Sequence, residues 1–427
     1  MKTLLIFAAI LAVAFGRQGF GSTDQEWGFV DVREDAHIFY WLYYTTALVA
    51  NVTEKPLVIW LQGGPGASGT GYGNFAELGP LDVDLNPRNH TWIRNYNVLF
   101  VDNPVGTGFS YVENNAYATT NRQIATDFLA FLKGFYAQNP IFLESDLFIF
   151  CESYGGKMTA EIALVLDQAI KAGELDISFK GVGLGDSWIS PIDSVLTWAP
   201  YLLNLGFIDQ NGYNEIEKVA NATREALNAG KYQEATNLWG ETESAVMDAA
   251  YEVDFYNVLK KIERGTGRKL HELFKPTSQL RDEDDEKIDV IMNGAVREAL
   301  NISRPWGTQS GKVFSYLAGD FMKPVTHVVE RLLNETSLIV AVYNGQLDLI
   351  VDTPGQVKWV DELRWEGSEI WKVAGRQPIV VDGMIEGFVK GVQTLTFYWI
   401  NRAGHMVPAD NPPAMNYILK HVTQHRC

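Results

Sequence analysis

Three polar residues, each at the end of a different apolar stretch, have the side chains that nucleophilic catalysis requires. Ser153 lies between the apolar run 147–150 and a segment with helical periodicity. A serine on such a strand-to-helix turn projects its hydroxyl above the sheet, and the first amides of the helix favour developing negative charge. Asp348 and His405 also come directly after apolar runs, and His405 would serve as the base that Asp348 orients. We therefore expect a catalytic triad of Ser153, Asp348 and His405.

The last two residues have simpler interpretations when each is considered alone. His405 would be a hydrogen-bonded loop histidine, and Asp348 would be a turn residue or a helix N-cap. Their joint placement after separate strands favours the triad. The chain order Ser, Asp, His is also that of α/β-hydrolases.

Two glycine-rich loops follow other apolar stretches. The loop 62–66, Gln-Gly-Gly-Pro-Gly, comes after Leu61 and would bring a backbone N–H to a substrate carbonyl. With the amide after Ser153 it would form an oxyanion hole, and its alternative is a plain turn. The loop 102–110 is interpreted as structural. Neither loop ends in Gly-Lys-Ser/Thr, which argues against a phosphate-binding loop.

The elements that must position these residues show as short, almost wholly apolar runs, typical of strands buried on both faces: 57–61, 98–101, 147–150, 179–184, 338–343 and 395–400. Helical patterns at 124–136 and 158–170 lie between some of these runs, which indicates a mostly parallel sheet with crossover helices. The β-rich segments 27–32 and 37–46 predict an antiparallel pair at the sheet edge. We expect an α/β fold of the α/β-hydrolase type, with helices on both faces of the sheet.

Regular alternation of strands and helices stops between residues 194 and 314. This block shows helical patterns at 214–229, 233–239, 241–262 and 288–300, and we interpret it as a helical cap insertion above the carboxyl edge of the sheet. The core would then comprise 17–193 and 315–427. The charged run 281–287 predicts a solvated loop, with a proteolytic processing site as the alternative.

The termini and the composition favour a secretory route. Residues 1–16 resemble a signal peptide, since the apolar run 4–15 is shorter than the roughly 20 residues that span a bilayer. Sequons for N-glycosylation agree with that route and occur at Asn51, Asn89, Asn221, Asn301 and Asn334. The net charge of -17 argues against nucleic acid or an anionic membrane as partner. With two cysteines in 427 residues, a large core rather than a disulfide framework must stabilise the fold.

Taken together, the motifs resemble the serine carboxypeptidase family from about Trp27 to the C-terminus, with the helical insertion matching least. The stretches that carry this resemblance are 60–66, 74–80, 102–111, 152–156, 344–348 and 404–408.

The resemblance implies a role for each matched position. It makes Ser153 the nucleophile, His405 the general base and then acid, and Asp348 the orienter. The oxyanion hole would be formed by the amides of Gly64 and Tyr154. The set that binds the substrate's free C-terminal carboxylate would be Gln62, Gly63, Glu77 and Glu152, and Met406 would help line the leaving-residue pocket. Because two adjacent carboxyls cannot both stay ionised, Glu77 and Glu152 would share a proton and accept an anionic substrate only while protonated. Ordinary surface acidity is the alternative for these two residues.

Four positions depart from the family pattern. Gln62 stands where most members have asparagine, and Gln346 replaces an acidic residue, which leaves Asp348 as the orienter. Ala67 replaces a cysteine, in line with missing family disulfides. Cys151 adds bulk at the tight turn, and we expect a buried free thiol rather than a disulfide with Cys427.

The leading hypothesis is a serine-type carboxypeptidase that releases C-terminal residues from peptides through an acyl-enzyme at acidic pH, without metal or cofactor. Alternatives are an acyltransferase of the same fold and a glycosylated binding or protective protein with weak or lost activity. Peptide or protein C-termini are the expected partners, with no stable membrane insertion. A homodimer, and secretion versus a lysosomal location, stay open.

Overall fold

A twelve-stranded sheet organises the chain in the computed structural model, which describes residues 17–262 and 283–424. Its spatial order is β1-β2-β3-β5-β4-β7-β8-β9-β12-β11-β10, with β6 beside β3. The strands are β1 Arg17–Gln18, β2 Asp24–Arg33, β3 Ala36–Tyr43, β4 Leu57–Leu61, β5 Asn97–Val101, β6 Tyr111–Val112, β7 Asp146–Glu152, β8 Ser178–Gly185, β9 Ile339–Gly345, β10 Gln377–Val381, β11 Met384–Val392 and β12 Leu395–Ile400.

The central strands β5, β4, β7, β8, β9 and β12 pair in parallel, and each coincides with one of the predicted apolar runs. Parallel strands carry helices on both faces, so both sides of each strand must be apolar. Along β4, for example, Ile59 belongs to the hydrophobic cluster on one face and Trp60 to the cluster on the other. The carboxyl ends of all these strands meet at one edge of the sheet.

The two sheet edges differ in how readily the sequence predicts them. The antiparallel pair of β2 and β3 is confirmed. The β10–β11 hairpin at the opposite edge was not predicted, because β10 has a single buried side chain, Ile379, between exposed neighbours such as Pro378 and Val380. A strand at the sheet edge needs no continuous apolar run, so it leaves little signal.

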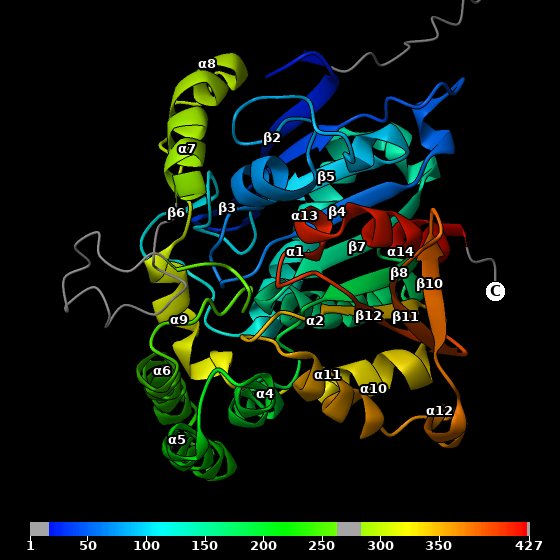
Figure 1. The fold of residues 1–427 in the computed structure, drawn as a ribbon. Coiled ribbons are helices and arrows are strands. Elements are labelled where there is room, and N and C mark those ends of the chain that lie inside the picture. Colours follow the sequence, from blue (N-terminus) through cyan, green and yellow to red (C-terminus); the bar gives the residue numbers. More distant parts are fainter. Residues whose placement is uncertain (1–16, 263–282, 425–427) are drawn as a thin grey trace, which may run out of the picture.

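Helices cover both faces of the sheet, as Figure 1 shows. In one cluster, helices α1, α2 and α10 contribute Phe128, Ile162 and Leu332, and in the other, α14 contributes Met415. The helices are α1 Asn121–Gln138, α2 Tyr154–Lys171, α3 Pro191–Val195, α4 Trp198–Leu205, α5 Gln210–Asn228, α6 Tyr232–Ala249, α7 Glu283–Ile291, α8 Arg297–Leu300, α9 Gly311–Phe321, α10 Thr326–Glu335, α11 Thr353–Asp361, α12 Ser368–Val373, α13 Val407–Asp410 and α14 Pro412–Gln424. The remaining helical segments are η1 Val52–Glu54, η2 Gly69–Leu78, η3 Trp92–Arg94, η4 Pro140–Glu144 and η6 Met292–Val296.

Two predictions in the helical region were wrong. The helix expected over 241–262 ends at Ala249, because Tyr251 and Glu252 adopt positive φ angles of 54° and 74° that end the helix. The predicted helices 233–239 and 241–262 instead share the single helix α6. The solvated loop expected over 281–287 contains the start of α7 at Glu283, where helix-forming residues lead into the buried Ile288.

The predicted division into core and cap stays a prediction, but two parts of residues 194–314 pack differently. Helices α4, α5 and α6 lie together at one end of the molecule (Figure 1). The segment from α7 to α8 instead packs on a face of the sheet, where Ile288 and Val296 share a hydrophobic cluster with Trp41. The indole of Trp27 on β2 also donates to the carbonyl of Leu300 at 2.9 Å.

Several predictions lie outside the described residues: the signal peptide at 1–16, positions 281 and 282 of the charged run, and Cys427. Within the ranges 17–262 and 283–424, none of the helices combines the length and the apolar character needed to cross a membrane.

Candidate active site

Ser153 occupies a sharp turn between β7 and α2. Its φ and ψ angles of 60° and -128° are a strained combination for a non-glycine residue. Two backbone bonds hold the turn: the Ser153 N–H donates to the Gly185 carbonyl at 3.0 Å, and the Trp188 N–H donates to the Ser153 carbonyl at 2.9 Å. The turn leaves the side chain partly exposed, whereas both flanking residues are buried. The predicted strand-to-helix geometry of Ser153 is therefore present.

His405 and Asp348 meet at the same edge of the sheet, on loops that follow β12 and β9. The imidazole Nδ1 of His405 lies 2.7 Å from Asp348 Oδ2, and both side chains are buried. Asp348 Oδ1 accepts the N–H of Val351 at 3.1 Å, which fixes the carboxylate plane. Burial lowers the pKa of His405, which favours the neutral imidazole. Among the contacts of the described residues, His405 and the Ser153 hydroxyl do not form a hydrogen bond, and such contacts are often longer before substrate binds.

The chain after α6 supports both loops through its backbone. The Tyr256 carbonyl accepts the N–H of His405 at 2.7 Å, and the Phe255 carbonyl accepts the N–H groups of Leu349 and Ile350 at 3.0 and 2.9 Å. This is the part of the predicted helix 241–262 that is not helical. Sequence reasoning missed it, because contacts made by backbone carbonyls do not depend on residue type. The residue that could have indicated a turn here is Asp254, whose carboxylate accepts hydrogen bonds from the amides of Tyr256 and Asn257.

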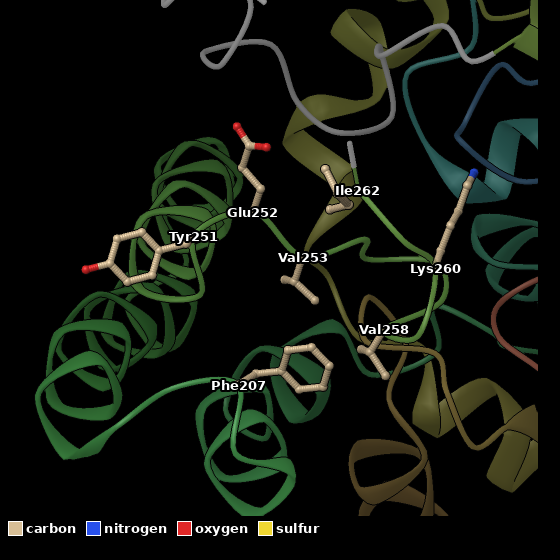
Figure 2. Close-up of a pocket in the computed structure, with 7 residues that line it drawn as sticks. All are labelled: Phe207, Tyr251, Glu252, Val253, Val258, Lys260 and Ile262. Atoms are coloured by element: carbon tan, nitrogen blue, oxygen red, sulfur yellow. The ribbon is translucent and has the colours of Figure 1, made fainter. Parts of the chain in front are cut away.

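The same segment borders a pocket of about 260 Å³ that is separate from the predicted site. Figure 2 shows Phe207, Val253 and Val258 pointing toward one another in it. None of the residues that line the pocket is a predicted catalytic or carboxylate-binding residue. Val258 also connects the pocket wall to the Asp348 loop, since its N–H donates to the Leu347 carbonyl at 3.0 Å.

Gln62 joins the two predicted glutamic acids in a buried cluster beside Ser153. Its amide nitrogen lies 2.9 Å from Glu77 Oε1 and 2.9 Å from Glu152 Oε1. Its amide oxygen accepts the indole N–H of Trp60 at 2.7 Å, which fixes the amide orientation. Both N–H groups of Gln62 are therefore donated to glutamates. The structure brings the three residues together.

The two glutamic acids have carboxyl groups that favour protonation. Their side chains are 1% and 4% exposed, which excludes ordinary surface acidity. The Oε2 atoms of Glu77 and Glu152 are buried, and no group among the described residues donates a hydrogen bond to them. Burial raises the pKa of Glu77 to about 7, and burial together with the Glu77 carboxylate raises the pKa of Glu152 well above its usual value. A shared proton removes the charge repulsion between the two carboxyl groups.

The loop 62–66 lies directly against the nucleophile. A Cβ at Gly63 would lie 2.5 Å from Ser153 Cβ and 3.0 Å from Ser153 Oγ, so only glycine permits this approach. Gly64 adopts a φ of 107°, which glycine tolerates best. Tyr154 begins α2, and its N–H is one of the first-turn amides that have no acceptor within the helix. The arrangement places the two predicted oxyanion-hole residues on either side of Ser153.

The loop 102–110, interpreted as structural, is held by a buried carboxylate. Asp102 accepts the Ser68 hydroxyl at 2.6 Å, the Thr70 hydroxyl at 2.9 Å and the Phe109 N–H at 2.8 Å. Burial raises the pKa of Asp102 to about 6 in spite of these donors. The carboxylate thus fastens this loop to the segment that leads into η2 and Glu77.

A second carboxyl that sequence reasoning missed lies next to the Asp348 loop. Asp186 comes directly after β8, is fully buried, and accepts the N–H of Gly345 at 2.8 Å. One carboxylate oxygen of Asp186, one of Asp348 and a ring nitrogen of His405 lie within 4.8 Å of one another. Its signal was the one that identified Asp348, namely an aspartic acid that follows a buried apolar run.

The remaining predicted residues have simpler surroundings. Cys151 is a free, buried thiol as expected, its Sγ lies 3.2 Å from the Gly183 carbonyl, and burial raises its pKa to about 12, so it is not a nucleophile at neutral pH. Met406 is partly exposed next to His405. Of the sequon asparagines, Asn221 alone is half-buried, in the middle of α5, and the exposed ones are Asn51, Asn89, Asn301 and Asn334.

Comparison with known proteins gives a consistent result along the whole chain. The model of a family described as "Serine carboxypeptidase" matches residues 17–425. The retinoid-inducible serine carboxypeptidase of Mus musculus is 45% identical over 414 residues, which cover 93% of this chain and 91% of that protein. Serine carboxypeptidase-like 51 of Arabidopsis thaliana is 38% identical over 448 residues, 96% of each chain. Among solved structures, the prohormone-processing carboxypeptidase Kex1 of Saccharomyces cerevisiae shares the fold, with a TM-score of 0.81, 22% identity and coverage of 94% of this chain and 91% of that one.

Proposed function

The chain belongs to the serine carboxypeptidase family and is a serine-type carboxypeptidase of the hydrolase class, and on this basis we propose that it releases C-terminal residues from peptides through an acyl-enzyme at acidic pH. In this proposal Ser153 is the nucleophile, His405 the general base and then acid, and Asp348 the residue that orients His405. The observation that carries the proposal is the position of the buried Glu77–Glu152 pair. Glu152 directly precedes Ser153 in the chain, and Gln62 joins it to Glu77.

The proposed reaction has two steps, formation of the acyl-enzyme and its hydrolysis. Ser153 Oγ attacks the scissile carbonyl carbon while His405 Nε2 takes the hydroxyl proton, and the amides of Gly64 and Tyr154 stabilise the oxyanion. The C–N bond then breaks, and the leaving amine takes the proton from His405. In the second step His405 removes a proton from water, whose oxygen attacks the acyl-enzyme, and Ser153 leaves with that proton. Asp348 stabilises the imidazolium in both steps.

The glutamate pair explains why the leaving residue would carry a free carboxylate. A protonated carboxyl can donate a hydrogen bond to an anion, whereas two ionised carboxylates would repel it. The unpartnered Oε2 atoms of Glu77 and Glu152 are the atoms available for that contact. The Gly63 amide would add a donor, Gln62 would hold the pair in place, and Met406 would line the leaving-residue pocket.

The pKa shifts of the two groups agree with activity in mildly acidic solution. The pKa of His405 is lowered by burial, so the imidazole is a neutral base below its usual pKa of 6.5. The pKa of Glu77 is raised to about 7, so the pair keeps its shared proton in the same range. Both requirements are met together only on the acid side of neutrality.

The test combines covalent labelling with product analysis. A serine-reactive fluorophosphonate should label the wild-type protein and not Ser153→Ala, and labelling of the variant would contradict the assignment of the nucleophile. Peptides with free C-termini, assayed by mass spectrometry from pH 4 to 8, should lose one residue at a time in the wild type only. Transfer of the acyl group to an added alcohol in preference to water would identify an acyltransferase, and labelling without turnover would favour a binding or protective role.

We also propose a secretory location and glycosylation. The sequons Asn51, Asn89, Asn301 and Asn334 are exposed, whereas Asn221 is half-buried in α5 and its amide nitrogen donates to the Glu217 carbonyl at 2.8 Å. The amide nitrogen of Asn334 also donates to a backbone carbonyl, that of Glu330 at 2.9 Å. Peptide or protein C-termini are the proposed partners, and a homodimer and the choice between secretion and the lysosome stay open.

A further inference from the structure

Asp186 is a buried carboxyl that the proposed reaction does not use. It follows β8 at the carboxyl edge of the sheet, between the Ser153 turn and the loop that carries Asp348. Its φ angle of 41° lies in the left-handed region, which aspartic acid and asparagine tolerate better than most residues. Its N–H donates to the Tyr343 carbonyl at 2.8 Å, so backbone contacts fix its position.

The two oxygens of Asp186 have unequal surroundings. Oδ1 accepts the N–H of Gly345 at 2.8 Å, whereas Oδ2 is buried and no described group donates to it. One carboxylate oxygen of Asp186 lies within 4.8 Å of a carboxylate oxygen of Asp348 and of a ring nitrogen of His405. Both oxygens of Asp348 have hydrogen-bond partners, because Oδ1 accepts the N–H of Val351 and Oδ2 is hydrogen-bonded to His405.

We infer that Asp186 is a positioning residue of the triad: it carries a proton on Oδ2 and donates it in a hydrogen bond to the carboxylate of Asp348. With this proton, Asp186 Oδ2 takes part in a hydrogen bond. The two carboxyls next to His405 then carry one negative charge instead of two. Burial, and next to it the Asp348 carboxylate, raise the pKa of Asp186 well above its usual value. Burial also raises the pKa of Asp348, but the hydrogen bonds from Asp186 and from the backbone of Val351 act in the opposite direction.

Several other titratable groups lie near Asp186 and His405. Those that face Asp186 are Asp348, His405, Glu152 and Tyr343, and those around His405 also include Glu77, Asp254 and Asp410. Because Glu77 titrates near neutrality, an absolute pH profile does not isolate Asp186. The difference between the pH profiles of the wild type and of a variant at position 186 isolates the contribution of Asp186.

The experiment measures the second-order rate constant for fluorophosphonate labelling of Ser153 as a function of pH. In this reaction Ser153 Oγ bonds to phosphorus, fluoride leaves, and His405 takes the hydroxyl proton, so the acid limb of the profile reports the pKa of His405. The inference rests on the proposed triad, and the two are tested separately. An unlabelled wild type would reject the triad, whereas the proton on Asp186 is tested by how the limb moves in a variant.

In Asp186→Asn, the amide reproduces a protonated carboxyl, with its oxygen toward Gly345 and its N–H₂ toward Asp348. We expect an acid limb within about 0.3 pH units of the wild type and a labelling rate within about threefold, since a neutral group replaces a neutral group. Were Asp186 ionised, removing a charge so near His405 would lower the limb by more than about one pH unit, and that shift would overturn the proposal.

Further variants keep the result decisive. Asp186→Ala removes the donor and should lower the labelling rate about tenfold. Asp352→Asn is the matched control, because Asp352 is another buried carboxyl at this sheet edge whose Oδ2 has no donor among the described residues, but it lies outside the cluster of Asp186, Asp348 and His405; it should behave as wild type. Failure of Asp186→Asn to fold would contradict the proposal, because the amide retains the hydrogen bonds. Loss of labelling after dialysis against a chelator would also overturn it, in favour of a bound cation in place of the proton.

Discussion

Two buried carboxyl pairs flank Ser153, and they differ in the donors around them. In the pair Glu77–Glu152, the single amide of Gln62 donates equally to both members at 2.9 Å, and each keeps one unpartnered oxygen. In the pair Asp186–Asp348 the donors are unequal, because Asp348 has the backbone of Val351 and the imidazole of His405. Each pair has room for one proton, but only the second assigns that proton to one member.

This difference separates substrate recognition from catalysis. A symmetrical pair holds its proton loosely, so it can present either a donor or an acceptor to an incoming carboxylate, and it titrates within the working pH range. An asymmetrical pair holds one charge at a fixed atom, which is what an imidazole needs in order to keep one tautomer. In the proposed mechanism, the two carboxyl pairs thus give a pH-sensitive binding site on one side of Ser153 and a constant charge on the other.

The largest effect is expected when the fixed charge of the second pair is removed. In Asp348→Asn the amide would favour the wrong His405 tautomer, so kcat should fall by about 10³ to 10⁴ with KM nearly unchanged. Steady-state kinetics on a free-acid peptide measure this, with Asp352→Asn as the control for loss of a buried carboxyl near the same loop. A loss confined to KM would show that Asp348 binds substrate and would remove the distinction between the pairs.

A smaller and different effect is expected from the first pair. Glu152→Ala should raise KM for a free-acid peptide by roughly 10-fold to 100-fold, because a hydrogen bond to a charged group is lost from a buried site. Turnover of the corresponding C-terminal amide should change little, since it presents no carboxylate. Both substrates are compared in one assay on the same variant. Equal losses on the two would mean that Glu152 acts through the Ser153 turn rather than on the carboxylate.

The pH dependence sharpens the same contrast. The pKa of Glu77 lies at about 7, so kcat/KM for a free-acid peptide should decline as pH rises through neutrality, when Glu77 ionises and its charge repels the substrate carboxylate. The amide substrate should lack that decline, and so should the free-acid peptide in the double variant Glu77→Gln/Glu152→Gln. Profiles from pH 4 to 9 provide the measurement. If wild-type profiles for acid and amide coincide, the shared proton does not control binding.

The sequence predicted the first pair and the triad more fully than the second pair. Ser153, Asp348 and His405 each follow an apolar run that coincides with a strand, and parallel strands bring their carboxyl ends to one edge. Asp186 follows such a run as well, but aspartic acid after a strand is usually a turn residue, and a single sequence does not show which of two carboxyls meets the imidazole.

Other features depended on tertiary contacts that leave no pattern. The Tyr256 and Phe255 carbonyls that hold the catalytic loops come from a segment with helical periodicity, and the positive φ angles that end α6 at Tyr251 and Glu252 occur at residues that do not favour them. The edge strand β10 has too few buried side chains to be recognised. The orientation of Gln62, which commits both its N–H groups to the glutamates, is set by the Trp60 indole and could be known only from the fold.

The smallest effect concerns stability, and its sign follows from the raised pKa of Glu77. A carboxyl whose pKa is about 7 in the folded state and 4.5 in the unfolded state binds more protons when folded, so its stabilising contribution is complete below pH 4.5 and is lost as pH rises to 7. The difference corresponds to about 3 kcal/mol and to a decrease in Tm of roughly 3 °C for a chain of this size. Glu77→Gln should flatten the dependence of Tm on pH between 4.5 and 7 in calorimetry, whereas Glu215→Gln, an exposed glutamate on α5, should leave it as in the wild type. Asp186→Asn should flatten it as well, because a carboxyl that keeps its proton in the folded state is ionised above its ordinary pKa of 3.8 in the unfolded state. An unchanged curve in Asp186→Asn would show that Asp186 is ionised in the folded state, and the contrast between a binding pair and a fixed-charge pair would then be lost.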